Sequence, residues 1–205
     1  MLIETSVVKD VKEHVMELLS SQLSDDLTYH SINHTLDVVK SANEIAEGQS
    51  FSEDEMEIIN IAAWFHDTGY TISSEDHEDY SAKIAKKYLK KKGYPEGKMA
   101  QVVGCILATK MPQTPNSKLE RVLCDADLMH LANEDYFSKA DLLHKEIEKT
   151  KLCKIPENEW LQMNQEFLKS HCFFTEYAHN TYDSAVKENL RKVRERLKSW
   201  QKTKK

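Results

Sequence analysis

The chain has 205 residues, of which 40% are hydrophobic and 30% are charged, a balance typical of a folded globular protein rather than a disordered one. Its formal net charge of −6 argues against a broad positive surface for duplex nucleic acid or for an anionic membrane. Only five Gly and four Pro occur, which favours long helices joined by short turns because a β-rich fold needs more turn residues.

The first part of the chain places apolar residues at helical spacing. Residues 3–20 carry an amphipathic stripe, and residues 23–30 interrupt it. A second helix is predicted over residues 31–47, with Gly48 as its C-terminal residue. Ser52 and Glu55 form a capping box for a third helix. The end of that helix, EMEIINIAAWF, is apolar enough to be buried on most sides, and Gly69 supplies the turn after it.

Five or six more helices follow by the same reasoning. Ser74 or Asp76 caps the segment HEDYSAKIAKKYLKKK, which Gly93 and Pro95 terminate. Residues 96–109 form the next helix, and a loop with two prolines follows. The remaining predicted helices cover residues 119–132 with a capping box of Ser117 and Glu120, 135–149 capped by Asn133, 157–171 after Pro156, and 175 or 176 to 200. The fold class is therefore predicted to be all-α, with eight or nine helices and no strand.

The cysteines and the termini indicate a cytoplasmic protein. The four cysteines make no CxxC pair, so they are expected to be buried free thiols in a reducing compartment. The N-terminus is charged too early for a secretory signal, and no apolar run approaches the roughly 18 residues of a membrane span. The basic stretch 187–205 is interpreted as a solvated helix end, in preference to a tail that binds nucleic acid or a partner.

The dyad His66-Asp67 is the first candidate for chemistry. It follows the apolar run IAAWF and precedes a glycine turn, so it lies where a buried helix ends. A buried imidazole and carboxylate need partners or a metal ion, because an unpaired buried charge is costly. On position alone, a core histidine with satisfied hydrogen bonds at a helix end is an equally good interpretation.

Two further residues favour a metal site. His34 lies on the second predicted helix, and Asp127 borders the apolar face of the segment VLCDADLMHL. Asp125 lies about 200° around the helix from Asp127 and is expected to face solvent or a neighbouring helix. Two imidazoles and two carboxylates suit a borderline divalent ion with open positions for water and substrate.

The order H…HD…D, here His34, His66-Asp67 and Asp127, resembles the signature of the HD superfamily of metal-dependent phosphohydrolases. The flanking motifs YHSINHTLDVV, IAAWFHDTGY, HEDYSAKIAKKYL, ILATKMP and LCDADL are similar to the branch described as predicted HD phosphohydrolases. The resemblance covers about residues 25–135 and extends weakly to FLKSHCFFTEYA. It implies a single compact HD-type domain over residues 1–205, with a metal-binding core at about 25–135 and a helical extension at about 136–205.

The same resemblance implies one divalent metal ion (Mn, Fe, Ni, Zn, Co or Mg) with His34, His66, Asp67 and Asp127 as ligands. In such enzymes a metal-bound water attacks phosphorus, and the dyad aspartate orients or deprotonates it, so Asp67 is both ligand and candidate base. The expected substrate is a small phosphomonoester or phosphodiester, nucleotide-like or a similar metabolite. The protein is expected to be a monomer or a homodimer that binds neither duplex nucleic acid nor membrane.

Two further catalytic candidates are His77 and Lys110. Some HD branches place a second metal at the position of His77, but they supply another histidine where this chain has Thr109 and Lys110. One metal is therefore favoured, with His77 acting on a phosphate oxygen or the leaving group rather than as a surface histidine. Lys110 either neutralises a substrate phosphate or satisfies the helix dipole. Tyr70 stands near the place of a proton-donating glutamate of other HD enzymes, and packing against a helix is the preferred interpretation.

The alternative to an enzyme is a catalytically weak module that keeps the HD fold and binds metal or nucleotide for regulation. The absence of a donor glutamate after the dyad supports this alternative. An oxygenase is less favoured, because that chemistry in this fold needs two irons and the second set of histidines is incomplete.

Overall fold

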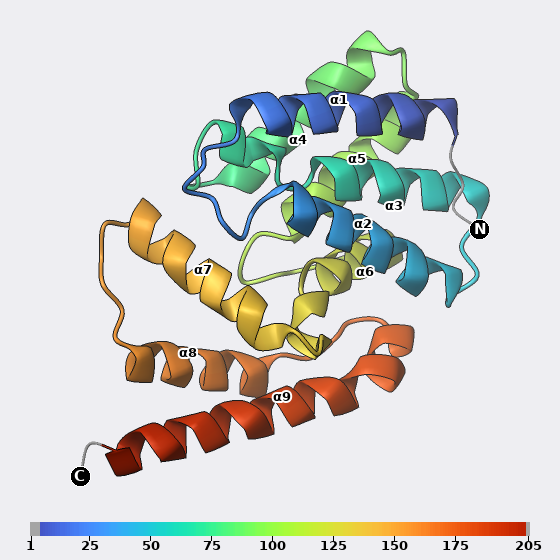
Figure 1. Ribbon diagram of the computed structural model, residues 1–205. Helices are drawn as coiled ribbons and strands as arrows, with labels where there is room; N and C mark the ends of the chain where they lie inside the picture. Colours follow the sequence, from blue (N-terminus) through green and yellow to red (C-terminus); the bar gives the residue numbers. More distant parts are fainter. Residues whose placement is uncertain (1–4, 204–205) are drawn as a thin grey trace. The chain divides into compact units, whose positions relative to one another are not determined.

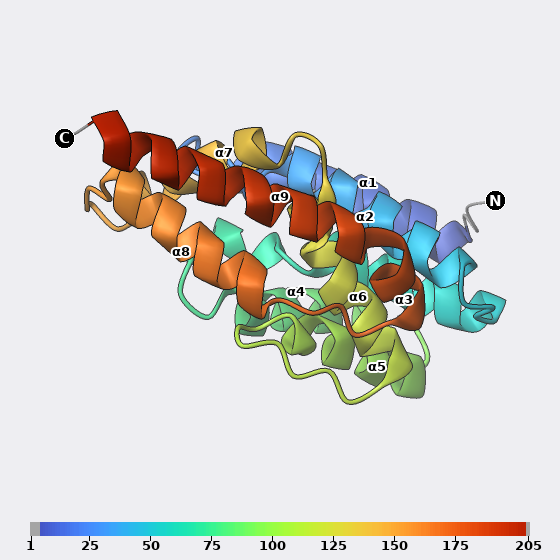
Figure 2. The same ribbon diagram turned by 90° about the horizontal axis from the view of Figure 1, so that it is seen from below.

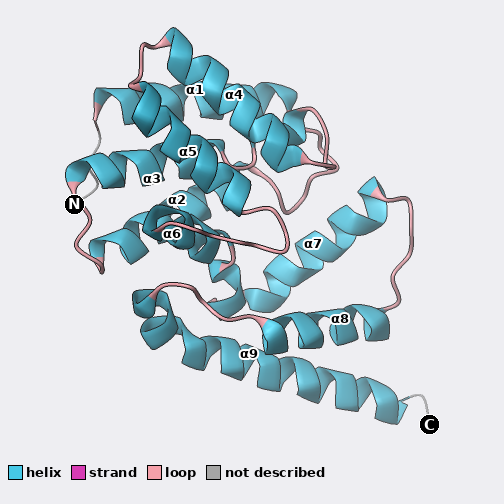
Figure 3. Ribbon diagram, turned by 180° about the vertical axis from the view of Figure 1, so that it is seen from behind, coloured by secondary structure: helices cyan, strands magenta, loops and turns pink. Residues whose placement is uncertain are grey.

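The computed structural model describes residues 5–203, which contain nine α-helices, two short 3₁₀ helices and no strand (Figure 3). The all-α prediction is confirmed. The elements are α1 (Ser6–Gln22), α2 (Ile32–Glu47), α3 (Glu53–Phe65), η1 (Thr68–Thr71), α4 (His77–Lys91), α5 (Glu96–Ala108), α6 (Lys118–Asp127), η2 (Met129–Ala132), α7 (Tyr136–Thr150), α8 (Glu157–Ser170) and α9 (Glu176–Thr203). Between residues 5 and 203, no helix has both the length and the apolar character that a membrane crossing requires.

The chain divides at Leu128 into two compact units, the first with α1 to α6 and the second with η2 and α7 to α9. The boundary lies between Leu128 and Met129, just after Asp127, so all four predicted metal ligands belong to the first unit. The sequence predicts one domain with a metal-binding core that ends near residue 135, and this stays a prediction.

Helix α3 lies at the centre of the first unit and packs against α1, α2, α4, α5 and α6 (Figure 1). Every residue from Ile58 to Phe65 is buried, as the apolar run predicts. Because burying apolar surface is the main favourable term in folding, this helix is the core around which the other five are placed.

The helix caps follow the sequence in part. Ser52 and Glu55 form the predicted capping box, in which the Ser52 hydroxyl accepts from the Glu55 amide and the Glu55 carboxylate accepts from the Ser52 amide. At Ser117 only half of the predicted box is present, because the Glu120 carboxylate accepts from the amide of Asn116 instead.

Two predicted caps are wrong in detail. Asp76 occupies the N-cap position of α4 in a left-handed conformation (φ 53°), and its side chain makes no capping hydrogen bond. Helix α7 has Asp135, not Asn133, at its N-cap position, again without a side-chain bond. Sequence spacing alone does not decide which polar residue stands at a helix start or whether its side chain caps the helix.

The second unit is built on the pairing of α8 with α9, which run alongside each other in Figure 2. Trp160, Leu161 and Leu168 are the buried residues of α8. The buried Asn189 of α9 donates hydrogen bonds to the carbonyls of Leu131 and Asn133, which attaches η2 to α9. These bonds satisfy a polar side chain in the interior, where an unpaired amide would be destabilising.

Candidate metal centre

His34 reaches the site from the first turn of α2. It shares the buried face of that helix with Val38, Ala42 and Ile45, at spacings of four, four and three residues. Its imidazole is 6% exposed, and the ring of Tyr29 packs against it at a centroid distance of 4.8 Å. The helical pattern of the sequence therefore points this imidazole into the interior.

His66 and Asp67 follow the last residue of α3, as the sequence predicts. His66 stands at the C-cap position, where its Nδ1–H donates to the carbonyl of Ala63 over 2.7 Å. A carbonyl only accepts, so this bond places a proton on Nδ1 and directs Nε2 into the site. Metal-binding histidines are commonly oriented by such a bond from their other ring nitrogen.

Asp127 is the last residue of α6, a helix that packs against α2. Its Oδ1 lies 3.2 Å from Nε2 of His34 and 3.7 Å from Nε2 of His66. The two Nε2 atoms face each other at 3.4 Å. Helices from three separate stretches of sequence thus bring two imidazoles and a carboxylate together.

Asp67, the residue after His66, adds a second carboxylate to the cluster. Its Oδ2 lies 3.3 Å from Nε2 of both His34 and His66, yet this buried oxygen has no hydrogen-bond partner within residues 5–203. A buried carboxylate oxygen without a hydrogen bond is costly and calls for another partner.

The spacing of these four donor atoms fits a divalent cation. Metal–ligand bonds of about 2.0–2.2 Å place neighbouring ligand atoms about 3.0–3.4 Å apart in octahedral or tetrahedral geometry. The ligand atoms of His34, His66 and Asp127 all lie within 4.8 Å of one another, and Asp67 contributes the oxygen that lacks a partner. All four predicted ligands are therefore brought together.

The charges of the cluster support the same interpretation. Burial opposes a charge on His66, but attraction to Asp67 and Asp127 outweighs it and raises the pKa of His66 to about 9. Burial also opposes ionised Asp67 and Asp127, yet the neighbouring imidazoles hold the pKa of both carboxyls below the usual range. The two ionised carboxylates therefore make the site favourable for a positive charge, either a protonated imidazole or a cation.

His77 borders this cluster from the first turn of α4. Its Nε2 lies 3.5 Å from Oδ1 of Asp67 and 3.6 Å from Oε1 of Glu78. The ring of Tyr70 stacks on those of His77 and His30, with centroid distances of 4.1 Å and 4.3 Å. Its hydroxyl oxygen lies 3.1 Å from Nε2 of His30. Tyr70 is thus packed between two histidines beside the site.

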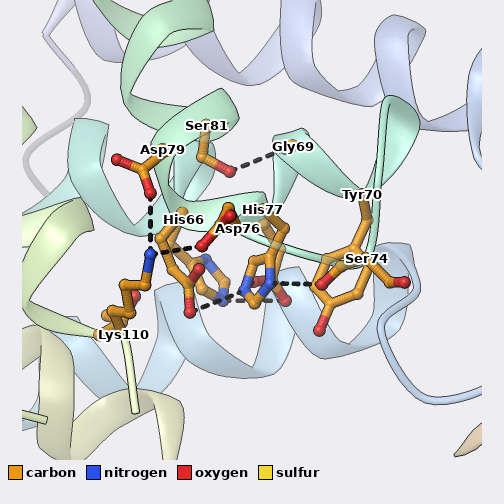
Figure 4. A network of polar contacts seen from close by, with 12 residues as sticks. His66, Gly69, Tyr70, Ser74, Asp76, His77, Asp79, Ser81 and Lys110 are labelled. Atoms are coloured by element: carbon orange, nitrogen blue, oxygen red, sulfur yellow. Dashed lines mark hydrogen bonds and ion pairs between the residues drawn. The ribbon is translucent and has the colours of Figure 1, made fainter. Parts of the chain in front are cut away.

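Lys110 lies near α4 but is already paired (Figure 4). Its amino group binds Oδ1 of Asp76 at 2.6 Å and Oδ2 of Asp79 at 2.9 Å. These three side chains are about half exposed or more, so their mutual attraction is screened by solvent. The sequence predicts a phosphate or the helix dipole as the partner of Lys110, and the two aspartates are partners that it does not indicate.

Gly69 has a different function from the predicted turn. A Cβ at this position would lie 1.9 Å from the backbone oxygen of His77 and 2.8 Å from the backbone nitrogen of Ser81. The Gly69 amide donates to the Ser81 hydroxyl over 2.7 Å (Figure 4). Glycine is required because η1 and the start of α4 approach each other closely, and this approach places His77 beside Asp67.

Two residues near the site escaped sequence reasoning. Glu78 is 7% exposed and approaches His77, although its place in an acidic first turn is typical of a surface residue that favours the helix dipole. Asp125, expected to face solvent or a neighbouring helix, is 0% exposed, so the solvent alternative is wrong. The alternative of a neighbouring helix stands, because α6 is covered on more than its apolar face.

The cysteine prediction is half correct. All four are free thiols, but only Cys105 and Cys124 are buried, while Cys153 and Cys172 are exposed. The exposed pair lies in the second unit, at the ends of α7 and α8. The sequence spacing contained no signal for exposure of the second pair.

Comparison with known proteins agrees with the geometry. The family model of the HD domain matches residues 31–132, a segment that contains His34, His66, Asp67 and Asp127. No curated protein matches the chain. A solved structure described as a predicted HD superfamily hydrolase from an uncultured Thermotogales bacterium superposes with a TM-score of 0.64 at 22% identity, covering 94% of this chain and 92% of that one.

That structural likeness shows a shared fold, and the sequence match identifies the domain. HD domains bind divalent metals, and the family match supports a metal-dependent hydrolase superfamily. Through residues 31–132, the chain belongs to the HD domain family.

Proposed function

We propose that this protein is a metal-dependent phosphohydrolase that cleaves a small phosphomonoester or phosphodiester with the help of one divalent ion. The observation that carries the proposal is the convergence of four donor atoms, with the two Nε2 atoms 3.4 Å apart and Oδ2 of Asp67 buried without a hydrogen bond. The family match supports a hydrolase, and the resemblance of the motifs to predicted phosphohydrolases supports a phosphate ester as substrate.

His34, His66, Asp67 and Asp127 would hold the ion. When bound, a divalent cation neutralises phosphate oxygens and lowers the pKa of a coordinated water, which are the two requirements of phosphate ester hydrolysis. The Nδ1–H bond of His66 to Ala63 keeps its Nε2 free for such an ion, and the buried position of His34 limits the directions its ring can take.

Asp67 has a second oxygen available for proton transfer. Oδ2 faces the two ligand imidazoles, whereas Oδ1 faces Nε2 of His77 at 3.5 Å. One carboxylate thus connects the ligand cluster with a histidine outside it. We propose that Asp67 accepts the proton of the attacking water and that His77 binds a phosphate oxygen or donates a proton to the leaving group.

Lys110 is the third proposed catalytic residue. Its amino group is bound by Asp76 and Asp79, on the turn before His77 and in the first turn of α4. A substrate phosphate would compete with these two aspartates for the ammonium group. Because half-exposed ion pairs contribute little free energy, replacing an aspartate by a phosphate as the partner costs little. The substrate is proposed to be nucleotide-like or a similar small metabolite, and the protein a monomer or homodimer.

The proposal is tested with a panel of phosphate esters. The purified chain is assayed on p-nitrophenyl phosphate, bis-p-nitrophenyl phosphate, nucleoside monophosphates and cyclic nucleotides, each with Mn²⁺, Fe²⁺, Ni²⁺, Co²⁺, Zn²⁺ or Mg²⁺. We expect metal-dependent release of phosphate or alcohol that disappears in His34→Ala. The control is His179→Ala, which removes an exposed imidazole from α9 and is expected to keep the activity.

An absence of turnover with every ester and metal, in protein that binds the ion, would contradict the enzyme proposal. It would favour the alternative of a regulatory module that keeps the HD fold.

A further inference from the structure

Two asparagines form a closed amide pair in the core between α2 and α3. The side-chain nitrogen of Asn43 donates to Oδ1 of Asn60 at 2.8 Å, and the nitrogen of Asn60 donates to Oδ1 of Asn43 at the same distance. The side chains are 4% and 3% exposed. Sequence analysis did not single out either residue.

Each amide also uses its second hydrogen within its own helix. Asn43 donates to the carbonyl of Val39 at 2.7 Å, and Asn60 donates to the carbonyl of Met56 at 2.9 Å. Both hydrogens of both amides are therefore bonded. A fully satisfied buried network of this kind is directional and specifies one arrangement of its helices. Removing one of the two amides leaves the other buried without a hydrogen-bond partner.

The two helices joined by this pair carry the metal ligands His34 and His66. Asn43 follows His34 by nine residues in α2, and Asn60 precedes His66 by six residues at the end of α3. The Nε2 atoms of these histidines stand 3.4 Å apart, so a slip of one helical turn, about 5.4 Å, would separate them. Metal binding thus demands a defined register between α2 and α3.

Apolar packing between these helices discriminates between registers less sharply than a bonded pair, because the hydrophobic effect is non-directional. The buried residues next to the pair along the two helices include small ones, such as Ala42 and Ala62, as well as large ones, such as Ile45 and Ile59. A buried polar pair that selects one register is a documented use of core polar groups.

We propose that the Asn43–Asn60 pair sets the register of α2 against α3 and is the positioning element that brings the imidazoles of His34 and His66 together. The proposal rests on the proposed metal site and concerns residues that do not touch the metal.

The test compares two double variants by Co²⁺ binding and by thermal unfolding. Asn43→Leu/Asn60→Ala removes both amides together and keeps the combined side-chain volume similar, so no buried amide loses its partner. The matched control, Ile45→Val/Ile59→Val, trims two fully buried residues of the same helices and leaves the amide pair intact. Co²⁺ alone is the probe, titrated by its visible absorption, which reports on ligand geometry.

We expect the amide variant to bind Co²⁺ at least about tenfold more weakly than wild type, in the range of losses found for residues that orient ligands, and with a changed visible spectrum. The isoleucine variant is expected to melt at a lower temperature but to bind Co²⁺ with wild-type affinity and spectrum. A folded amide variant with wild-type Co²⁺ affinity and spectrum would overturn the proposal, because a purely structural pair affects stability alone.

If Asn43→Leu/Asn60→Ala does not fold, the reverse arrangement Asn43→Ala/Asn60→Leu is measured against the same criteria. Failure of both to fold would also overturn the proposal, since the pair would then be needed for folding itself rather than for register. Wild-type protein that binds no Co²⁺ would overturn the metal site and the proposed function, an outcome distinct from a variant that matches wild type.

Discussion

Asp67 presents its two oxygens to different partners. Oδ2 lies 3.3 Å from both ligand imidazoles, and Oδ1 lies 3.5 Å from Nε2 of His77. The adjacent residue His66 supplies an imidazole to the same cluster, so the dyad contributes two candidate ligand groups from consecutive positions at the end of a buried helix. This arrangement explains why the pair stands directly after an apolar run.

The substitution Asp67→Ala tests this double function. Removing the carboxylate takes away one proposed ligand and the proposed base. We therefore expect the rate of hydrolysis to fall by at least about 100-fold, more than the loss typical of residues that only hydrogen-bond to metal ligands. Metal content measured by elemental analysis is expected to fall in parallel. A metal-replete Asp67→Ala variant with wild-type turnover would contradict both assignments.

His171 gives a residue-scale prediction about pH. Burial lowers the pKa of its imidazole, against a smaller opposite effect of Asp183, and its Nε2 has no hydrogen-bond partner among residues 5–203. Because the folded pKa lies below the unfolded value of about 6.5, the unfolded chain takes up the proton first as the pH falls. This residue therefore destabilises the fold as the pH drops below about 6.5.

The variant His171→Phe removes this proton uptake and keeps a ring that packs against Phe173, which lies 4.7 Å from the imidazole. We expect its melting temperature to fall less than that of wild type between pH 7.5 and pH 5.5. Parallel loss of stability in the two proteins, followed by circular dichroism, would show that His171 does not contribute to acid sensitivity.

At the scale of elements, the approach of η1 to α4 depends on Gly69. A Cβ there would lie 1.9 Å from a backbone oxygen, so Gly69→Ala requires α4 to move away. We expect a loss of about 2 kcal/mol or more in the free energy of unfolding, the range of severe backbone clashes. Because His77 is the first residue of α4, activity is expected to fall as well.

Gly97→Ala is the matched control for this substitution. It lies in the first turn of α5, where an added Cβ meets no atom within 4 Å. Replacing a helical glycine by alanine is expected to stabilise the protein by about 0.4–1 kcal/mol. Urea unfolding of both variants tests the pair, and equal effects of the two alanines would contradict the close approach at Gly69.

The elements that sequence predicts well are those decided locally. The helical spacing of apolar residues predicted α1 to α9, and the capping box at Ser52 is present as expected because its partners are three residues apart. Prediction failed where distant residues decide. Lys110 pairs with Asp76 and Asp79, more than thirty residues earlier, and no local pattern indicates such a contact.

The site followed the same rule. The candidate ligands were predicted because their order along the chain resembles that of a known family, whereas periodicity alone left His66 equally well explained as a core histidine. Burial of Glu78 and Asp125 and the stacking of Tyr70 between His30 and His77 depend on how whole helices pack. A helical wheel does not contain that information, since it describes one element without its neighbours.

For the whole molecule, the four cysteines offer a test of the packing. Burial raises the pKa of Cys105 to about 12 and raises that of Cys124 as well, and the Cys124 thiol donates to the carbonyl of Ala108. Cys153 and Cys172 are exposed. We expect a thiol reagent at pH 8 to label two cysteines quickly in the native protein and all four after denaturation.

Labelling kinetics with peptide mapping identify the fast sites. Rapid reaction of Cys105 or Cys124 in the native protein would contradict the packing of α5 against α6, the helices that carry them.

The central claim is that one divalent ion is held by His34, His66, Asp67 and Asp127. The most direct measurement is anomalous X-ray diffraction from crystals of the protein grown with Mn²⁺. We expect a single anomalous peak about 2.0–2.3 Å from Nε2 of both histidines and from a carboxylate oxygen of each aspartate. The absence of a peak among these four residues would contradict the claim, and a second peak bonded to His77 would replace the one-metal site with a two-metal site.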